Sequence, residues 1–129
     1  MWFLKAHVMV HVQVIQLFDS WASHLSPRDF DTFAAPYTTR ILADFKKTHP
    51  HVPTILYISG SGGLLERMAA CKPDCLSIDG SVDLADAIKR CGTDFAYQGN
   101  IDPGCASSST ASLLGTTAGN NCWERVNAA

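Results

Sequence analysis

Four short apolar runs alternate with three segments of helical periodicity, and this alternation restricts the fold more than any other feature of the sequence. The apolar runs cover residues 12–18, 52–58, 75–78 and 94–97, and the helical segments cover residues 27–47, 64–71 and 82–90. Apolar runs of this kind are typical of strands buried on both faces. Strands that alternate with helices through short links predict an α/β fold with a parallel sheet. Such βα units form either an open doubly wound sheet or part of a (β/α)8 TIM barrel.

The first helical segment carries its own start and stop signals. Ser26 is a capping residue type and Pro27 suits the first helical position, whereas Pro36 is expected to break or kink the helix. The side chains expected on its apolar face are Phe30, Phe33, Ala34, Tyr37, Ile41, Leu42 and Phe45. The basic pairs at residues 46–47 and 89–90 are expected to be solvated helix ends.

Composition excludes several classes of protein. The chain has 129 residues, of which 47% are hydrophobic and 17% charged, so it suits one folded domain rather than a disordered chain. A net charge of −2 offers no basic excess for nucleic acid. No apolar stretch is long enough to span a membrane, and the N-terminus is a poor signal peptide. Five cysteines without a CxxC pair favour a reducing compartment.

Polar residues follow each predicted strand, at residues 19–20, 59–60, 79–80 and 98–100. The carboxyl ends of parallel strands share one edge of the sheet, where α/β proteins place their chemistry. Asp19 and Asp79 are therefore candidate general acids or bases if burial raises their pKa values. The alternative is that each caps the following helix or tightens a turn, and for Asp79 this alternative is favoured.

The glycine-rich turn at residues 60–63 imitates a dinucleotide-binding fingerprint, because Asp79 follows Gly60 by 19 residues. Leu65 replaces the third glycine, so a tight βα turn is favoured over nucleotide binding. A metal site is not predicted. The histidines at positions 7, 11, 49 and 51 and the cysteines at 71 and 75 fit no standard ligand spacing.

Four elements together resemble the uroporphyrinogen decarboxylase family. They read QLFDSWA at residues 16–22, GSGGLLE at 60–66, SID at 77–79 and QGNIDP at 98–103. The resemblance runs from about residue 12 to residue 104. It divides the chain into a non-family segment at residues 1–11, a partial barrel of four strands and three helices at 12–104, and a low-complexity tail at 105–129 that is expected to be disordered.

The resemblance implies an incomplete (β/α)8 barrel that binds uroporphyrinogen III. Members of the family remove the four acetate carboxyls of uroporphyrinogen III as CO2 and form coproporphyrinogen III in haem and chlorophyll synthesis. The family uses no metal or organic cofactor and is usually a homodimer. Ser20 matches a hydroxyl that contacts the substrate, and Asp19, Gly60, Asn100 and Asp102 are weaker substrate-binding candidates. A cytoplasmic or plastid location is expected.

Departures from the family pattern affect the expected activity. The arginine-rich segment, an essential aspartate, a substrate tyrosine and a late histidine of the family have no counterpart here, so no catalytic residue is assigned and the chain alone is expected to be inactive. The family's Asp-Trp-Thr-Val is Asp-Gly-Ser-Val at residues 79–82. A related family of cobamide-dependent methyltransferases is a further alternative, but its zinc-binding His-x-Cys corresponds to Tyr-Ile-Ser at residues 57–59.

Overall fold

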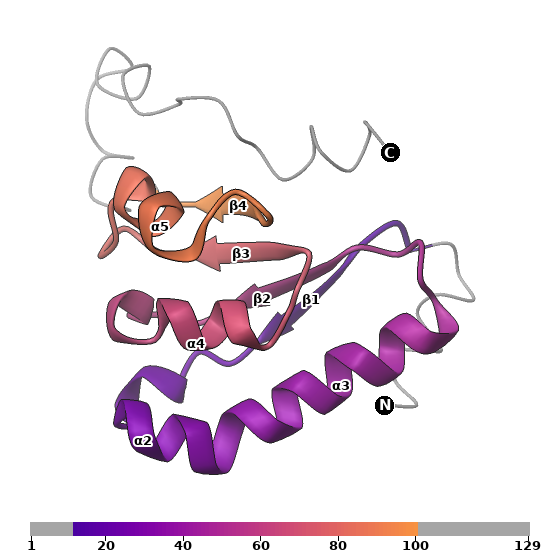
Figure 1. The fold of residues 1–129 in the computed structure, drawn as a ribbon, viewed down its shortest axis with the longest axis horizontal. Coiled ribbons are helices and arrows are strands. Elements are labelled where there is room, and N and C mark those ends of the chain that lie inside the picture. Colours follow the sequence, from indigo (N-terminus) through magenta and orange to yellow (C-terminus); the bar gives the residue numbers. More distant parts are fainter. Residues whose placement is uncertain (1–11, 101–129) are drawn as a thin grey trace.

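The four expected strands lie side by side in chain order. In the computed structural model, which describes residues 12–100, they form a parallel sheet of order β1-β2-β3-β4 (Figure 1). The strands are β1 (Ile15–Phe18), β2 (Thr54–Tyr57), β3 (Cys75–Ile78) and β4 (Ala96–Gly99). The last strand lies two residues later than expected, because Gln98 and Gly99 still pair with Ser77 and Ile78. The parallel α/β class is confirmed, and the sheet is open within the described residues.

Helices connect successive strands and cover one face of the sheet. They are η1 (Ala22–His24), α2 (Pro27–Asp29), η2 (Phe30–Ala34), α3 (Ala35–Thr48), η3 (Ser61–Gly63), α4 (Leu65–Ala70) and α5 (Leu84–Cys91). The main core joins one face of the strands to these helices; its members include Leu56, Leu76 and Tyr97 from the sheet and Leu42, Met68 and Ala87 from the helices. The opposite face carries a separate cluster of Ile55, Cys75 and Ala96, which includes no helical residue.

Side-chain caps begin two of the helices. The Ser26 hydroxyl accepts a hydrogen bond from the Asp29 N–H at 3.1 Å, and Pro27 follows at the first helical position, as the sequence predicts. Asp83 caps α5 by accepting a hydrogen bond from the Asp86 N–H at 3.0 Å. Each cap satisfies an N–H that has no partner within its own helix.

Pro36 interrupts the long helical segment as expected, but the consequence for the buried face was not foreseen. The proline has no N–H to continue the helical hydrogen-bond ladder, and the preceding residues form the wide π-helical turn η2. This turn changes the angular register of the side chains. Phe30 is fully buried, whereas Phe33 and Tyr37 are more than half exposed. The buried positions of α3 are instead Thr38, Leu42 and Phe45.

Of the two lysines at the end of α3, Lys46 is less solvated than predicted and Lys47 is exposed as predicted. Lys46 lies 2.8 Å from the Asp74 carboxylate and also donates to the carbonyl of Val52 at 3.1 Å. This lysine therefore anchors the end of α3 to the loop that enters β2. Lys47 is mostly exposed and pairs with Asp44 of the same helix at 2.9 Å.

The predictions for residues 1–11 and 105–129 lie outside the described residues. Within residues 12–100, none of the helices combines the length and apolar character needed to cross a bilayer. The candidate site is described from the sheet and helices of residues 12–100.

Candidate functional site at the carboxyl edge of the sheet

The register of the sheet brings the ends of all four strands to one edge. Phe18 is level with Tyr57, Tyr57 with Ser77, and Ser77 with Gln98. The loops that follow these residues carry the polar side chains predicted as site candidates. We call this region the carboxyl edge, meaning the loops that directly follow β1 to β4.

The loop after β1 carries Asp19 and Ser20. The Asp19 N–H donates to the Tyr57 carbonyl at 2.9 Å, and the Asp19 carbonyl accepts from the Ala22 N–H at 3.1 Å. These bonds fix the loop to the end of β2 and start the short helix η1. Ser20 is exposed, so its hydroxyl is accessible to a ligand. A hydroxyl of this kind can donate to a carboxylate.

The loop after β2 turns through Gly60, whose φ of +66° is a conformation that favours glycine. Its N–H donates to the carboxylate of Asp79, at the end of β3. The same carboxylate accepts from the N–H of Ser81 at 3.1 Å and from the Ser81 hydroxyl. Asp79 therefore both tightens its own turn, as predicted, and joins two neighbouring loops of the carboxyl edge.

These hydrogen bonds favour the ionised form of Asp79. Partial burial raises its pKa, but hydrogen bonds from Gly60, Ser81 and Ser59 outweigh burial and hold the pKa below its ordinary value. The interpretation of Asp79 as a general acid with a raised pKa is therefore wrong. Its carboxylate is ionised at neutral pH and is engaged by donors of the protein itself.

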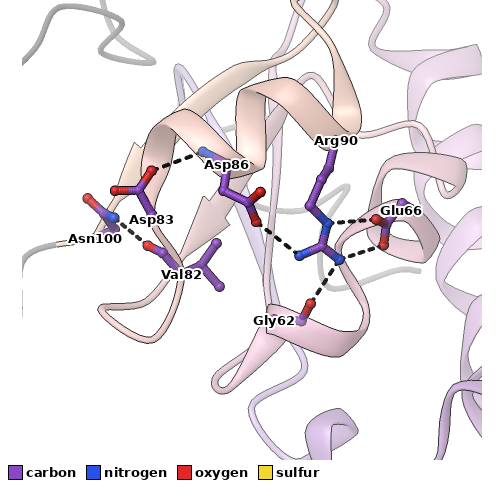
Figure 2. A network of polar contacts seen from close by, with 7 residues as sticks. All are labelled: Gly62, Glu66, Val82, Asp83, Asp86, Arg90 and Asn100. Carbon is purple, nitrogen blue, oxygen red and sulfur yellow. Dashed lines mark hydrogen bonds and ion pairs between the residues drawn. The ribbon is translucent and has the colours of Figure 1, made fainter.

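The end of β4 has an unusual backbone. Gly99 has a φ of +104°, and a Cβ at this position would lie 2.1 Å from the Ile78 carbonyl oxygen, so only glycine fits. Asn100 has a φ of +125°, and its side-chain amide donates to the Val82 carbonyl. Figure 2 shows this bond, which ties the end of β4 to the loop after β3. The Gly-Asn pair thus shapes the carboxyl edge through its backbone.

Arg90 of α5 supports the glycine-rich turn from the outside. It forms two hydrogen bonds with the Glu66 carboxylate, at 2.7 and 2.8 Å, and a third with the Gly62 carbonyl at 2.9 Å (Figure 2). The hydrogen bond from Arg90 is the main cause that lowers the pKa of Glu66. Asp86 lies 3.4 Å from the same guanidinium. Arg90 therefore lies at an exposed helix end as predicted, but its guanidinium also holds the glycine-rich turn, which was not predicted.

The structure also tests the nucleotide alternative. In a dinucleotide site the glycine-rich turn offers free N–H groups to a pyrophosphate. Here the N–H of Gly60 is already bonded to the Asp79 carboxylate, whose negative charge opposes a phosphate. The spacing that imitated the fingerprint instead reflects an internal hydrogen bond. Within residues 12–100, no three histidine, cysteine or acidic side chains are grouped to hold a metal ion.

The predicted candidates are thus brought together in part. Gly60, Asp79 and Asn100 belong to interlinked loops, and the loop that carries Asp19 and Ser20 is bonded to the end of β2. Asp102 lies outside the described residues. Residues 98–100 were predicted to lie at this edge, but neither the backbone role of Gly99 nor the contact of Arg90 with the glycine-rich turn was predicted.

The fold and the site place the chain in a broad class of α/β proteins. Its parallel βα units with a polar carboxyl edge are typical of α/β barrels and doubly wound sheets. The sequence matches the uroporphyrinogen decarboxylase (URO-D) family over residues 1–118. This chain belongs to that family, and its sheet is an open part of the family's barrel.

Curated relatives agree with this assignment. The chain is similar to the uroporphyrinogen decarboxylase of Trichodesmium erythraeum, with 58% identity over 71% of this chain and 26% of the relative. It is 55% identical to the enzyme of Nostoc punctiforme over the same shares of the two chains. It is 51% identical to that of Crocosphaera subtropica over 79% of this chain and 29% of the relative. The chain thus spans between a quarter and a third of the length of these relatives.

Proposed function

We propose that this chain contributes one wall of a uroporphyrinogen decarboxylase site, and that the carboxyl edge faces the tetrapyrrole. The relatives carry the name of this carboxy-lyase activity. The observation that supports the proposal most directly is the register that aligns the ends of the four strands, because it gathers polar loops of the family's specific motifs at one edge. No other surface of the described residues carries these motifs together.

The proposed reaction explains why such an edge suits the substrate. Protonation of a pyrrole ring creates an electron sink next to the acetate side chain. The bond between the acetate methylene and its carboxyl carbon then breaks, its electron pair moves into the ring system, and CO2 leaves. A proton added to the methylene carbon completes a methyl group, and the proton first added to the ring is released, which restores the aromatic pyrrole. The protein must hold several carboxylates and stabilise the cationic ring, which is the task of preorganised hydrogen-bond donors and charges.

Within this site, Ser20 is the proposed contact to a substrate carboxylate. It is exposed on a loop whose backbone is bonded to β2, so its hydroxyl is held near the other strand ends. Asp19, Gly60, Asn100 and Asp102 are proposed as weaker contributors. Gly60 and Asn100 contribute through the shape of the loops, because the N–H of Gly60 and the amide of Asn100 already donate to protein acceptors.

We expect the 129-residue chain to have no turnover alone. Its four described strands form an open sheet, and it spans 26–29% of the relatives' length. The purified chain should produce no coproporphyrinogen from uroporphyrinogen III in an anaerobic assay with chromatographic detection. Measurable product would contradict this expectation.

A chimera tests the function of the edge itself. Residues 12–104 would replace the corresponding segment of the Trichodesmium erythraeum enzyme, and we expect the chimera to decarboxylate uroporphyrinogen III. Ser20→Ala in this chimera should raise KM by about 10- to 100-fold, the effect of losing a hydrogen bond to a charged group. Ser26→Ala is the matched control, since Ser26 caps α2; it should lower stability and leave KM unchanged. A stable but inactive chimera would overturn the proposed function.

A further inference from the structure

Asp79 is the point at which two loops of the carboxyl edge meet. Its side chain accepts hydrogen bonds from the N–H of Gly60 in the preceding loop and from the N–H and hydroxyl of Ser81 in its own loop. An ionised acceptor makes stronger hydrogen bonds than a neutral one. The carboxylate therefore fixes the position of the Gly60 turn relative to the end of β3.

The Gly60 turn in turn lies against the loop after β1. A Cβ built on Gly60 would lie 3.3 Å from both the Cβ and the Oγ of Ser23. At this separation an added side chain would require Ser23 to move by a few tenths of an ångström. The Gly60 turn and the side chain of Ser23 therefore lie close together, so we expect a displacement of the turn to reach Ser23.

Ser23 belongs to the same short segment as Ser20. The segment is held on one side by the bond from the Asp19 N–H to the Tyr57 carbonyl, and it closes on itself through the bond from the Ala22 N–H to the Asp19 carbonyl. Its other restraints are the burial of Ala22 in the main core, the turn bonds from the His24 and Leu25 N–H groups, and the proximity of Ser23 to Gly60. The position of the Gly60 turn is therefore one of the contacts that orient the loop carrying Ser20.

We propose that Asp79 is a positioning residue that holds the Gly60 turn against Ser23 and thereby orients the loop carrying Ser20. The proposal rests on the proposed function for the role of Ser20, but the mechanical connection stands on its own contacts. Asp79 touches no substrate in this role. It acts through Gly60 and Ser23, across three successive loops.

Asp74 provides a matched comparison at the opposite end of the same strand. Its carboxylate accepts hydrogen bonds from the N–H and the hydroxyl of Thr54, at 2.7 Å each, and it pairs with Lys46. It therefore links β3 to β2 as Asp79 does, but at the end where the two strands begin. Loss of Asp74 should affect stability without changing the Ser20 loop selectively.

Amide hydrogen exchange in the full 129-residue chain tests the proposal. In Asp79→Ala, exchange should become about tenfold faster in peptides covering residues 59–62 and 79–83, the effect of losing hydrogen bonds to a charged acceptor, and also in residues 19–25. Asp79→Asn, which keeps one acceptor oxygen, should restore most of the protection in residues 19–25. In Asp74→Ala, faster exchange should appear around residues 54 and 74, with residues 19–25 unaffected.

Two results would overturn the proposal: unchanged exchange in residues 19–25 of Asp79→Ala, or an equal increase there in Asp74→Ala. If Asp79→Ala does not fold, Gly60→Ala replaces it, because the added Cβ displaces Ser23 directly while Asp79 is retained. Faster exchange in residues 19–25 of Gly60→Ala supports the proposal, and unchanged exchange contradicts it. Neither measurement requires turnover. An inactive chimera therefore counts against the proposed function alone, and an unresponsive loop counts against the positioning role alone.

Discussion

Asp74 accepts two hydrogen bonds from Thr54, one from the backbone N–H and one from the side-chain hydroxyl. Thr54 reciprocates, since its hydroxyl oxygen accepts from the Asp74 N–H at 3.2 Å. The pair links the starts of β2 and β3, and Asp74 also pairs with Lys46 of α3. It is a structural element of the sheet, at the end remote from the candidate site.

Asp74 should make stability depend on pH in the acid range. Burial raises its pKa, but bonds from Lys46 and Thr54 prevail, and the pKa lies below its ordinary value of 3.8. A carboxyl with a depressed pKa in the folded state stabilises the fold above the pKa of the unfolded chain, and this contribution is lost as pH falls through the folded pKa. We therefore expect the urea midpoint to fall as pH decreases below about 4. The urea midpoint of Asp74→Asn should decrease less, whereas Asp94→Asn, at an exposed position, should behave as the wild type. Identical acid profiles for all three proteins would contradict the prediction.

Gly99→Ala should destabilise the fold by about 3 kcal/mol, through a strained φ and a clash with the Ile78 carbonyl. Gly63→Ala is the matched control, because a Cβ there meets no atom within 4 Å, and its effect should stay within about 0.5 kcal/mol. Equilibrium urea unfolding followed by circular dichroism measures both free energies. Equal effects of the two substitutions would show that the backbone at residue 99 is not constrained in this way.

Arg90→Lys should lower the free energy of unfolding by about 1 kcal/mol, although it conserves charge. Lysine cannot reproduce the paired bonds to Glu66 together with the bond to the Gly62 carbonyl. The control is Arg28→Lys, at an exposed position, which should be neutral. Thermal unfolding of both variants distinguishes a geometric role of the guanidinium from a simple charge effect, which lysine would preserve.

Ser61→Ala should increase stability by about 1 kcal/mol. The Ser61 hydroxyl is fully buried and has no hydrogen-bond partner within the described residues, so it carries a desolvation cost that alanine removes. Ser81→Ala should have the opposite effect, because its hydroxyl donates to Asp79. Urea unfolding compares the two variants directly, and a loss of stability in Ser61→Ala would mean that its hydroxyl is bonded after all.

The sheet and its polar edge were predictable because they follow from local patterns. Apolar runs of strand length, the Ser26–Pro27 helix start and the polar residues after each strand are all read from neighbouring positions. Parallel strands then place these ends at one edge without any knowledge of long-range contacts. The family resemblance of QLFDSWA and QGN agrees with the family match.

The contacts that give the edge its geometry were not predictable in the same way. Arg90 and Glu66 are separated by 24 residues, and Gly60 and Asp79 by 19, so their bonds depend on how the units pack. The exposure of Phe33 and Tyr37 follows from a single wide turn before Pro36, which regular helical periodicity does not include. The contacts and exposure of these residues depend on the three-dimensional packing, which sequence spacing alone does not predict.

The order β1-β2-β3-β4 has a consequence for how the chain acquires its structure. Within residues 12–100, each strand pairs only with the strand before or after it in the sequence, so none of these pairings has to wait for a distant segment. Each new βα unit can add to a template that the ribosome has already released. Each addition covers the free edge of the strand before it, so β2 and β3 become paired on both sides while β1 and β4 keep one free edge each.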